Sequence, residues 1–252
     1  MIKNQRQQQI LDLIKENGSC TVQNLSQMFS VSEPTIRTDL RNLEKDGSII
    51  RQHGGAFLKQ ETLHTVNLTL EDRGHNEEKR RIAKRAAKYV KENDNIILDS
   101  GTTVTALADE LINVSPLQIL TNSINIGFQL SKAPNTVVML GGEIKKPTLS
   151  LSGSIGISML QGVMVDYLFL ATGGLDLNVG LSLPSFNDVE LKKAMIASAK
   201  KVILLADSSK IGKVRFAAMG CLDKIDVVIT DDKVDPVIKK GLEDLNIEVV
   251  VC

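Results

Sequence analysis

Cysteine and long apolar segments are both scarce in this sequence of 252 residues. The three cysteines, Cys20, Cys221 and Cys252, lie far apart and form no C-x-x-C pair, which argues against a disulfide framework and a thiolate zinc site. No apolar run approaches the roughly 20 residues that span a bilayer, and the polar start MIKNQRQQQ lacks a secretory h-region. These absences predict a cytoplasmic protein with no membrane partner.

Histidine and nucleotide-binding motifs are missing from most of the chain. His53, His64 and His75 all lie in the first third, so the remainder has no histidine for catalysis or for holding a metal ion. No G-x-G-x-x-G follows the first strand-like run of the larger part, and no G-x-x-x-x-G-K-[ST] occurs. We therefore expect no metal and no cofactor.

Charge of one sign is not in excess. The 30 Lys and Arg residues balance the 30 Asp and Glu residues, and a net charge of zero, taken alone, argues against a nucleic-acid partner. Residues 1–60, however, carry 8 basic and 6 acidic side chains (8 − 6 = +2), and residues 61–252 carry 22 and 24 (22 − 24 = −2). The first part therefore has the sign expected of a segment that meets an anionic polymer.

The first sixty residues predict three short helices and a hairpin. The first helix covers 5–17, Thr21 caps the second, and Ser32 begins the third, which closes at Asp46-Gly47. The strand-like segments 48–51 and 56–58 then flank a glycine-rich turn. This order is that of a winged helix-turn-helix.

The third predicted helix has polar positions suited to DNA. Arginine reaches guanine edges with two hydrogen bonds, threonine suits phosphates or thymine methyl groups, and basic wing residues can enter the minor groove. Glu33, Asp39 and Glu44 reduce the positive charge of the same helix. The alternative is a small helical packing module with solvated polar faces. The candidate DNA contacts are Thr35, Arg37, Thr38, Arg41, Arg51 and His53.

A polar segment, 59–75, follows and is interpreted as a linker. Residues 76–91 then predict a helix whose basic residues, Lys79 among them, are interpreted as a solvated face. We place a helix-turn-helix domain at 1–58 and a second domain at 76–252.

Short apolar runs alternate with helix-like segments in the second domain. The predicted strands are 95–98, 118–120, 136–140, 167–170, 202–205, 227–229 and 248–251, and the predicted helices are 104–111, 124–130, 187–199 and 236–245. This alternation predicts an α/β fold with a mostly parallel sheet.

Small polar residues recur where these strands end. Ligands of open α/β sheets bind outside the carboxyl ends of the strands. Ser100-Gly101-Thr102-Thr103 leads directly into a helix, so backbone N–H groups, hydroxyls and the helix dipole would converge on a phosphate-sized anion. Lys210, in another such loop, would add a charged contact. The alternative for each loop alone is ordinary turn chemistry.

Motifs along nearly the whole chain resemble the DeoR family of bacterial transcriptional regulators. The strongest are SEPTIRTDLRNLE with its Gly-Gly wing, and LDSGTT, DYLFLATGGLD and LLADSSKIGK in the second domain. The resemblance implies that 32–40 is the recognition helix, which adds Ser32 to the candidate DNA contacts. It also implies a sensor domain related in fold to ribose-5-phosphate isomerase and CoA-transferases. The implied effector residues are Asp99, Ser100, Gly101, Thr102, Thr103, Thr121, Asn122, Ser123, Gly141, Gly142, Ser152, Gly153, Asp207 and Lys210.

Two positions depart from the family pattern. Gly173 stands where an aspartate is common, and Asp188 stands where a glutamate is frequent. Both departures concern the identity of the ligand rather than the fold.

These observations predict a repressor of a sugar or polyol catabolic operon, controlled by a phosphorylated sugar or polyol. Its partners would be double-stranded operator DNA and further copies of itself, in a dimer or tetramer. The alternative is a sugar-phosphate isomerase or deaminase with an attached DNA-binding domain. Its acid and base would come from Asp99, Asp176, Asp188 and Glu190. Because the domain lacks histidine, we expect no enzyme.

Overall fold

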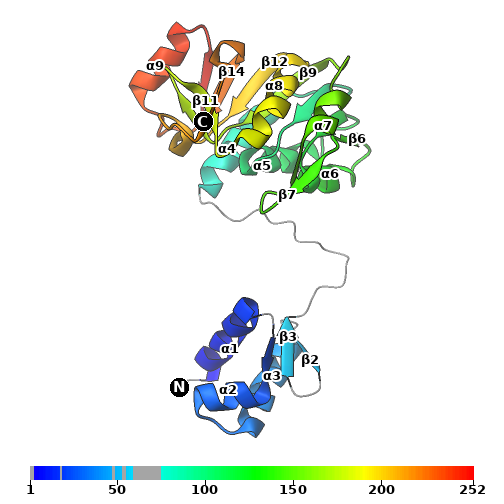
Figure 1. The fold of residues 1–252 in the computed structure, drawn as a ribbon, viewed down its shortest axis with the longest axis vertical. Helices are drawn as coiled ribbons and strands as arrows, with labels where there is room; N and C mark the ends of the chain where they lie inside the picture. The colour runs from blue at the N-terminus through cyan, green and yellow to red at the C-terminus, as the bar shows by residue number, and fades with distance from the viewer. Residues whose placement is uncertain (1–2, 18, 47–48, 53–54, 59–74) are drawn as a thin grey trace. The chain divides into compact units, whose positions relative to one another are not determined.

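Two compact units make up the computed structural model of the chain, Met1–Asn67 and Leu68–Cys252 (Figure 1). The structure describes residues 3–17, 19–46, 49–52, 55–58 and 75–252. The predicted linker, 59–75, lies outside these ranges except for its last residue, so its boundaries stay a prediction. No helix of the described ranges is long and apolar enough to cross a membrane.

The first unit is a winged helix-turn-helix, as the sequence predicted. Its helices are α1 (Lys3–Asn17), α2 (Val22–Phe29) and α3 (Glu33–Lys45). Its strands are β1 (Ser19–Thr21), β2 (Ile49–Gln52) and β3 (Gly55–Leu58), paired antiparallel in the order β1-β3-β2. The sequence did not predict β1, because a three-residue strand has no periodicity to detect.

Local sequence explains where these helices begin and end. The Thr21 hydroxyl accepts a hydrogen bond from the backbone N–H of Asn24 at 3.2 Å and so caps α2. Ser30, at φ 53°, ends that helix in the left-handed conformation. Ile10, Ile14, Leu25, Ile36 and Leu40 are buried together and hold the three helices in one core.

Asp39 lies on the buried side of α3 and not on its outer face. Its Oδ2 accepts from Arg6 Nε at 2.7 Å and its Oδ1 from Gln7 Nε2 at 3.0 Å, so both contacts tie α3 to α1. The interpretation that Asp39 weakens the basic outer face is therefore wrong: Asp39 is 1% exposed and Arg6 neutralises it.

The second unit is built on a seven-stranded parallel sheet with the order β15-β14-β12-β9-β4-β5-β6. The strands are β4 (Asn95–Leu98), β5 (Gln118–Thr121), β6 (Thr136–Met139), β9 (Val165–Ala171), β12 (Ala199–Leu205), β14 (Val227–Thr230) and β15 (Glu248–Val251). Each overlaps a predicted strand. The predicted α/β fold class is confirmed.

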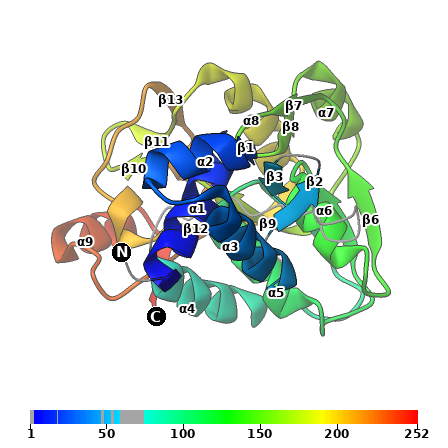
Figure 2. The same cartoon turned by 90° about the horizontal axis from the view of Figure 1, so that it is seen from below.

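Two layers cover the sheet. Helices α4 (Asn76–Ala87), α5 (Thr102–Leu111) and α6 (Ile124–Leu130) lie on one face. The other face carries α7 (Ser154–Met159), α8 (Val189–Ala197), α9 (Pro236–Asp244) and a small antiparallel sheet of β10 (Gly174–Asp176), β11 (Gly180–Leu183) and β13 (Ala217–Gly220). Figure 2 shows α4 and α5 on one side of β9 and β12, with α8, β11 and β13 on the other.

The strand order reverses between β4 and β9. From β4 the chain adds β5 and then β6 on one side, and it returns to add β9, β12, β14 and β15 on the other. The loops after β4 and β9 consequently leave the sheet in opposite directions and open a crevice at its carboxyl edge, which is the usual ligand position in such sheets.

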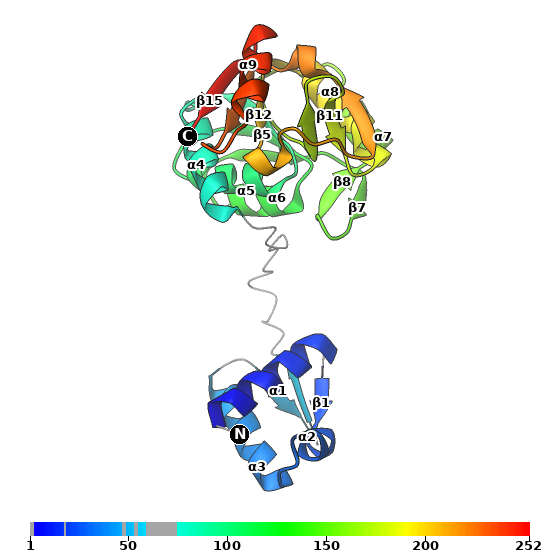
Figure 3. The ribbon, with the colours of Figure 1, turned by 90° about the vertical axis from the view of Figure 1, so that its left-hand side faces the viewer.

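A hairpin of β7 (Glu143–Lys145) and β8 (Ser150–Ser152) reaches this edge. It is docked by two backbone bonds, from Ile124 N–H to Leu149 O at 3.1 Å and from Leu151 N–H to Asn122 O at 2.7 Å. Figure 3 shows the hairpin projecting beside α6. The sequence predicted no strands here.

We predict that Asp39→Ala lowers the free energy of unfolding of the first unit by about 3 kcal/mol, because Arg6 loses its buried partner. The measurement is calorimetry of the full chain. Glu33→Ala on the same helix is the control, since it removes only an exposed pair with Arg37 and should cost less than about 1 kcal/mol. Equal losses in the two variants would contradict the assigned role of Asp39.

Candidate functional site

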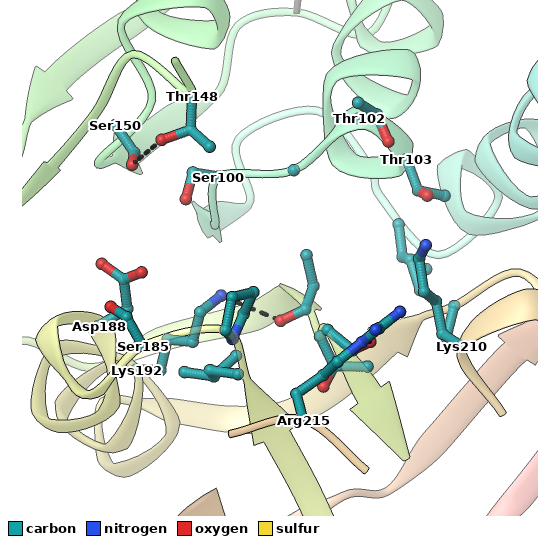
Figure 4. A pocket seen from close by; sticks show the side chains of 18 of the residues that line it. Ser100, Thr102, Thr103, Thr148, Ser150, Ser185, Asp188, Lys192, Lys210 and Arg215 are labelled. Atoms are coloured by element: carbon teal, nitrogen blue, oxygen red, sulfur yellow. Dashed lines mark hydrogen bonds between the residues drawn. The ribbon is translucent and has the colours of Figure 1, made fainter. Parts of the chain in front are cut away.

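A cavity of about 560 Å³ opens at the point where the strand order reverses (Figure 4). Its wall includes the loop after β4 (Ser100–Thr103), the loop after β9 (Ala171–Gly173) and the loop after β12 with Asp207 and Lys210. The hairpin tip (Lys145–Thr148) and the start of α8 complete it. The topology therefore brings together segments from across the whole unit at one place.

The loop after β4 is shaped to receive an anion. Gly101 precedes α5, and a side chain there would lie 2.6 Å from Ala171 Cβ, so the close approach of the two loops requires glycine. With no side chain at this position, no side chain caps α5, and the N–H groups of its first turn are left for another partner. Ser100, Thr102 and Thr103 line the cavity beside them.

Positive charge predominates in the cavity wall. Within the described ranges its basic side chains are Lys79, Lys145, Lys146, Lys192, Lys210 and Arg215, and its acidic ones are Asp188 and Asp207. The surplus, six against two, favours an anionic ligand.

Some of these cations already have acidic partners. Lys145 pairs with Asp188 and Lys192 with Asp99. Lys146, Lys210 and Arg215 form no ion pair with any described residue, and the Arg215 Nε donates only to the Gly173 carbonyl at 3.0 Å. These three charges are therefore available to a ligand.

Asp99 lies behind the cavity wall and forms a buried ion pair with Lys192, which lines the cavity. The Asp99 Oδ2 accepts from Lys192 Nζ and from the Ala171 backbone N–H at 2.9 Å, and Lys192 Nζ also donates to the Ala171 carbonyl at 3.0 Å. Asp99 is 0% exposed. The pair connects β4, β9 and α8, which makes Asp99 a residue that positions the wall.

The predicted effector residues divide into two groups in the structure. Ser100, Gly101, Thr102, Thr103, Asp207 and Lys210 line the cavity. The others do not: Asp99, Thr121, Asn122, Ser123, Gly141, Gly142, Ser152 and Gly153. Their part in binding stays a prediction.

Several residues of the second group hold the loops around the cavity in place. Asn122 Nδ2 donates to Ser100 Oγ at 3.4 Å, and the Thr121 hydroxyl donates to the Leu98 carbonyl at 2.7 Å. Gly142 has φ +141°, and a Cβ there would lie 2.1 Å from the Ser152 carbonyl oxygen, so this glycine lets the β6–β7 turn pack against β8.

Further residues line the cavity that were not predicted from the sequence, among them Lys79, Lys145, Lys146, Thr148, Ser150, Lys192 and Arg215. The interpretation of Lys79 as part of a solvated face is wrong, because it is 5% exposed. For Lys192 a signal existed: Val189, Lys192 and Ile196 share one helical face at i, i+3 and i+7, which buries the lysine.

The predicted DNA contacts lie on and next to α3. Arg37 and Arg41 are exposed one turn apart, and Arg37 Nη2 contacts Glu33 Oε2 at 3.2 Å. The Thr38 hydroxyl donates to the Pro34 carbonyl at 3.0 Å. The hydroxyls of Ser32 and Thr35 are hydrogen-bonded to each other at 2.9 Å.

The wing residues are placed only in part. Arg51 Nε donates to Glu44 Oε2 at 2.8 Å, and this hydrogen bond, with the nearby Arg41 charge, lowers the pKa of the exposed Glu44 carboxyl. DNA contact by Arg51 would have to compete with that bond. His53 lies outside the described residues, so its predicted role is not placed.

Comparisons with known proteins agree along the whole chain. Residues 6–62 match the model of the DeoR-like helix-turn-helix domain, and residues 74–232 match that of the DeoR C terminal sensor domain. An uncharacterized HTH-type transcriptional regulator of Bacillus subtilis, YulB, is 37% identical, and the match covers 99% of this chain and 96% of that protein. The glycerol-3-phosphate regulon repressor of Escherichia coli is 32% identical, with 100% of both chains covered.

A solved structure is similar to part of the chain. Ribose 5-phosphate isomerase from Plasmodium falciparum has 20% sequence identity and a TM-score of 0.38, and the match covers 53% of this chain and 52% of that one. At that TM-score the similarity says nothing about the function of this chain.

We predict that Lys192→Met lowers the free energy of unfolding of the second unit by about 3 to 5 kcal/mol, because it leaves the buried Asp99 carboxylate unpaired. The double variant Asp99→Asn with Lys192→Met should lose less, since no buried charge then lacks a partner. Urea unfolding followed by the fluorescence of Tyr89 and Tyr167 measures both. Lys193→Met is the control, because its pair with Glu190 is exposed. A loss as small as that of the control would refute the prediction.

Proposed function

Because this chain belongs to the DeoR family of transcriptional regulators, we propose that it represses a sugar or polyol catabolic operon under the control of a phosphorylated sugar or polyol. The effector binds in the cavity between the β4 and β9 loops. The observation that carries the proposal is the positive surplus of the cavity wall around the uncapped start of α5.

The chemistry of the wall supports a phosphorylated polyhydroxy ligand. The first turn of α5, with Thr102, Thr103 and Lys210, offers N–H groups, hydroxyls and a positive charge to a phosphate. The remaining hydroxyls of the wall, among them Ser150 and Thr172, suit a ligand with several hydroxyl groups. A relative that matches over its full length is named as a glycerol-3-phosphate regulon repressor, and glycerol 3-phosphate belongs to the chemical class of the proposed effector.

The exposed face of α3 supports operator binding. Arg37 and Arg41 lie on the helix that enters the major groove in helix-turn-helix proteins. One such module neutralises few DNA phosphates and therefore binds weakly. Tight binding requires two modules of a homo-oligomer, each bound to one half-site of the operator.

Effector control requires two states of the oligomer that differ in affinity for both ligands. The phosphorylated ligand shifts the population only as far as it binds one state better than the other. By reciprocity, operator DNA then changes the affinity for the effector by the same factor.

The alternative is a sugar-phosphate isomerase or deaminase with an attached DNA-binding domain. Such chemistry needs a base next to a ligand carbon. Asp99 is buried in its pair with Lys192, Asp176 accepts from the backbone N–H groups of Asn178 and Val179, and Glu190 is exposed outside the cavity wall. Only Asp188 of the four candidate acids lines the cavity. Turnover of phosphosugars by the purified chain would favour the enzyme.

We predict that Arg41→Ala weakens binding to the operator about 5- to 100-fold, because an arginine contact to a base edge is lost. Gel shift at fixed salt, with DNA from upstream of the gene of this chain and with random DNA, provides the measurement. Arg85→Ala, the same substitution on an exposed position of α4, should leave binding unchanged. No preference of the natural chain for its own upstream DNA would contradict the repressor itself.

We also predict that Lys210→Ala leaves operator binding without effector intact. The effector concentration needed to change operator binding should rise about tenfold or more, because a charge-assisted contact to the phosphate disappears. A thermal-shift screen of glycerol 3-phosphate, ribose 5-phosphate, fructose 6-phosphate, glucose 6-phosphate and sorbitol 6-phosphate identifies binders by the stabilisation they cause. Lys213→Ala, an exposed neighbour outside the cavity wall, is the control. A normal response of Lys210→Ala would remove this residue from the site.

A further inference from the structure

The large sheet of the second unit ends at β6. This strand pairs with β5 on one side, and no strand of the described residues pairs with its other side. Figures 1 and 2 show β6 at the rim of the second unit. Native proteins commonly protect such an edge with a charged residue or a proline, because its free N–H and C=O groups pair readily with another strand. Thr136–Met139 contains neither.

The free backbone groups of this edge belong to Val137 and Met139. The N–H groups of Thr136 and Leu140 donate to carbonyl groups on the β5 side, at 2.9 Å and 2.8 Å. Successive residues of a strand direct their backbone groups to opposite sides. Val137 and Met139 therefore each direct one donor and one acceptor away from the sheet, and Val138 between them does not.

Apolar side chains lie exposed on both faces of the same edge. Val137 packs against the core under α6, so Val138 lies on the opposite face, which α7 covers. There Met159 Sδ accepts from the N–H of Gly141, just after β6, at 3.2 Å. An exposed apolar patch of this kind marks an interaction site. Its members are Phe128 of α6, Val138, Ile155 and Met159.

We propose that two copies of this chain pair antiparallel through β6, about a two-fold axis at Val138, so that their large sheets join into one. In this register Val137 of each copy lies opposite Met139 of the other, and every free donor of the edge meets a free acceptor. The two Val138 residues form the central pair without hydrogen bonds, with Cα atoms about 4.5 Å apart. The inference rests on the homo-oligomer of the proposed function and supplies its contact surface.

Charge favours a second copy as the occupant of this edge. Because β6 has no charged residue, two copies bring no like charges together in the ladder. Antiparallel pairing also brings the segment before β6 of one copy, with the exposed Lys132, to the segment after β6 of the other, with the exposed Glu143. The other edge of the sheet is less suited, because β15 begins with the charged Glu248.

A charge exchange at Val138 in the full chain tests the pairing, because the axis places this residue opposite itself. Light scattering after gel filtration measures the mass of the natural chain, of Val138→Lys, of Val138→Glu and of an equimolar mixture of the two variants. Val251→Lys and Val251→Glu are the matched controls, since Val251 is 42% exposed on the other edge strand. Thermal melting establishes that the variants fold.

We expect the natural chain to form a dimer or tetramer, and each Val138 variant to need about a tenfold higher concentration or more to form this contact, because like charges then face each other. The mixture should associate as the natural chain does, since opposite charges then face each other. The two controls should keep the natural mass. Val138 variants that keep the natural mass would overturn the proposal, and so would a mixture that does not associate.

Hydrogen exchange of the natural chain decides the question if the Val138 variants do not fold. The amides of Val137 and Met139 should exchange slowly in the oligomer and rapidly after dilution to the monomer. Rapid exchange in the oligomer would overturn the pairing, and slow exchange in the monomer would show that the chain covers its own edge. A natural chain that is monomeric at every concentration contradicts the homo-oligomer of the proposed function as well, whereas an oligomer insensitive to Val138 overturns the interface alone.

Discussion

The buried pair of Asp99 and Lys192 is the interaction on which the site depends. It lies where the strand order reverses, and it joins the end of β4, the end of β9 and the middle of α8. Burial of two charges is costly, and hydrogen bonds to Asp99 Oδ2 and from Lys192 Nζ offset part of that cost, while Asp99 Oδ1 has no donor among the described residues. The Ala171 backbone supplies both a donor and an acceptor, and with them the pair fixes the separation of the two loops.

The remaining geometry of the cavity follows from this separation. Gly101 approaches Ala171 so closely that no side chain fits, and the start of α5 is consequently left uncapped beside the crevice. On the other side, α8 is held against β9 through Lys192, which also fixes Asp188 at the beginning of that helix. The loop that precedes α5 and the helix that follows Asp188 thus both depend on one ion pair.

The sequence predicted the large sheet because its strands are buried on both faces and read as unbroken apolar runs. Phe169 and Leu170 face different cores, yet both are fully buried. The β7–β8 hairpin could not be predicted in the same way, because its strands have only three residues each. Its position is fixed by backbone hydrogen bonds to the loop between β5 and α6. The basic side chains that this hairpin brings to the cavity, Lys145 and Lys146, were missed for the same reason. Glycines and hydroxyl residues at strand ends are visible in a sequence, but which of them line a cavity depends on side-chain packing.

A net charge of zero conceals two positive surfaces in this chain. One is the exposed side of α3 with the adjoining wing. Because Asp39 is buried against Arg6, four basic side chains stand there against three acidic ones: Arg37, Arg41, Lys45 and Arg51 against Glu33, Glu44 and Asp46. The other is the cavity of the second unit, with six basic side chains against two acidic ones among the described residues. The two surfaces share no residue and belong to separate compact units, so the proposed anionic effector would not compete with DNA for the same charges. Any influence of one anion on the other must therefore pass through a change in the arrangement of units or subunits, and its size is bounded by the difference in effector affinity between the two arrangements.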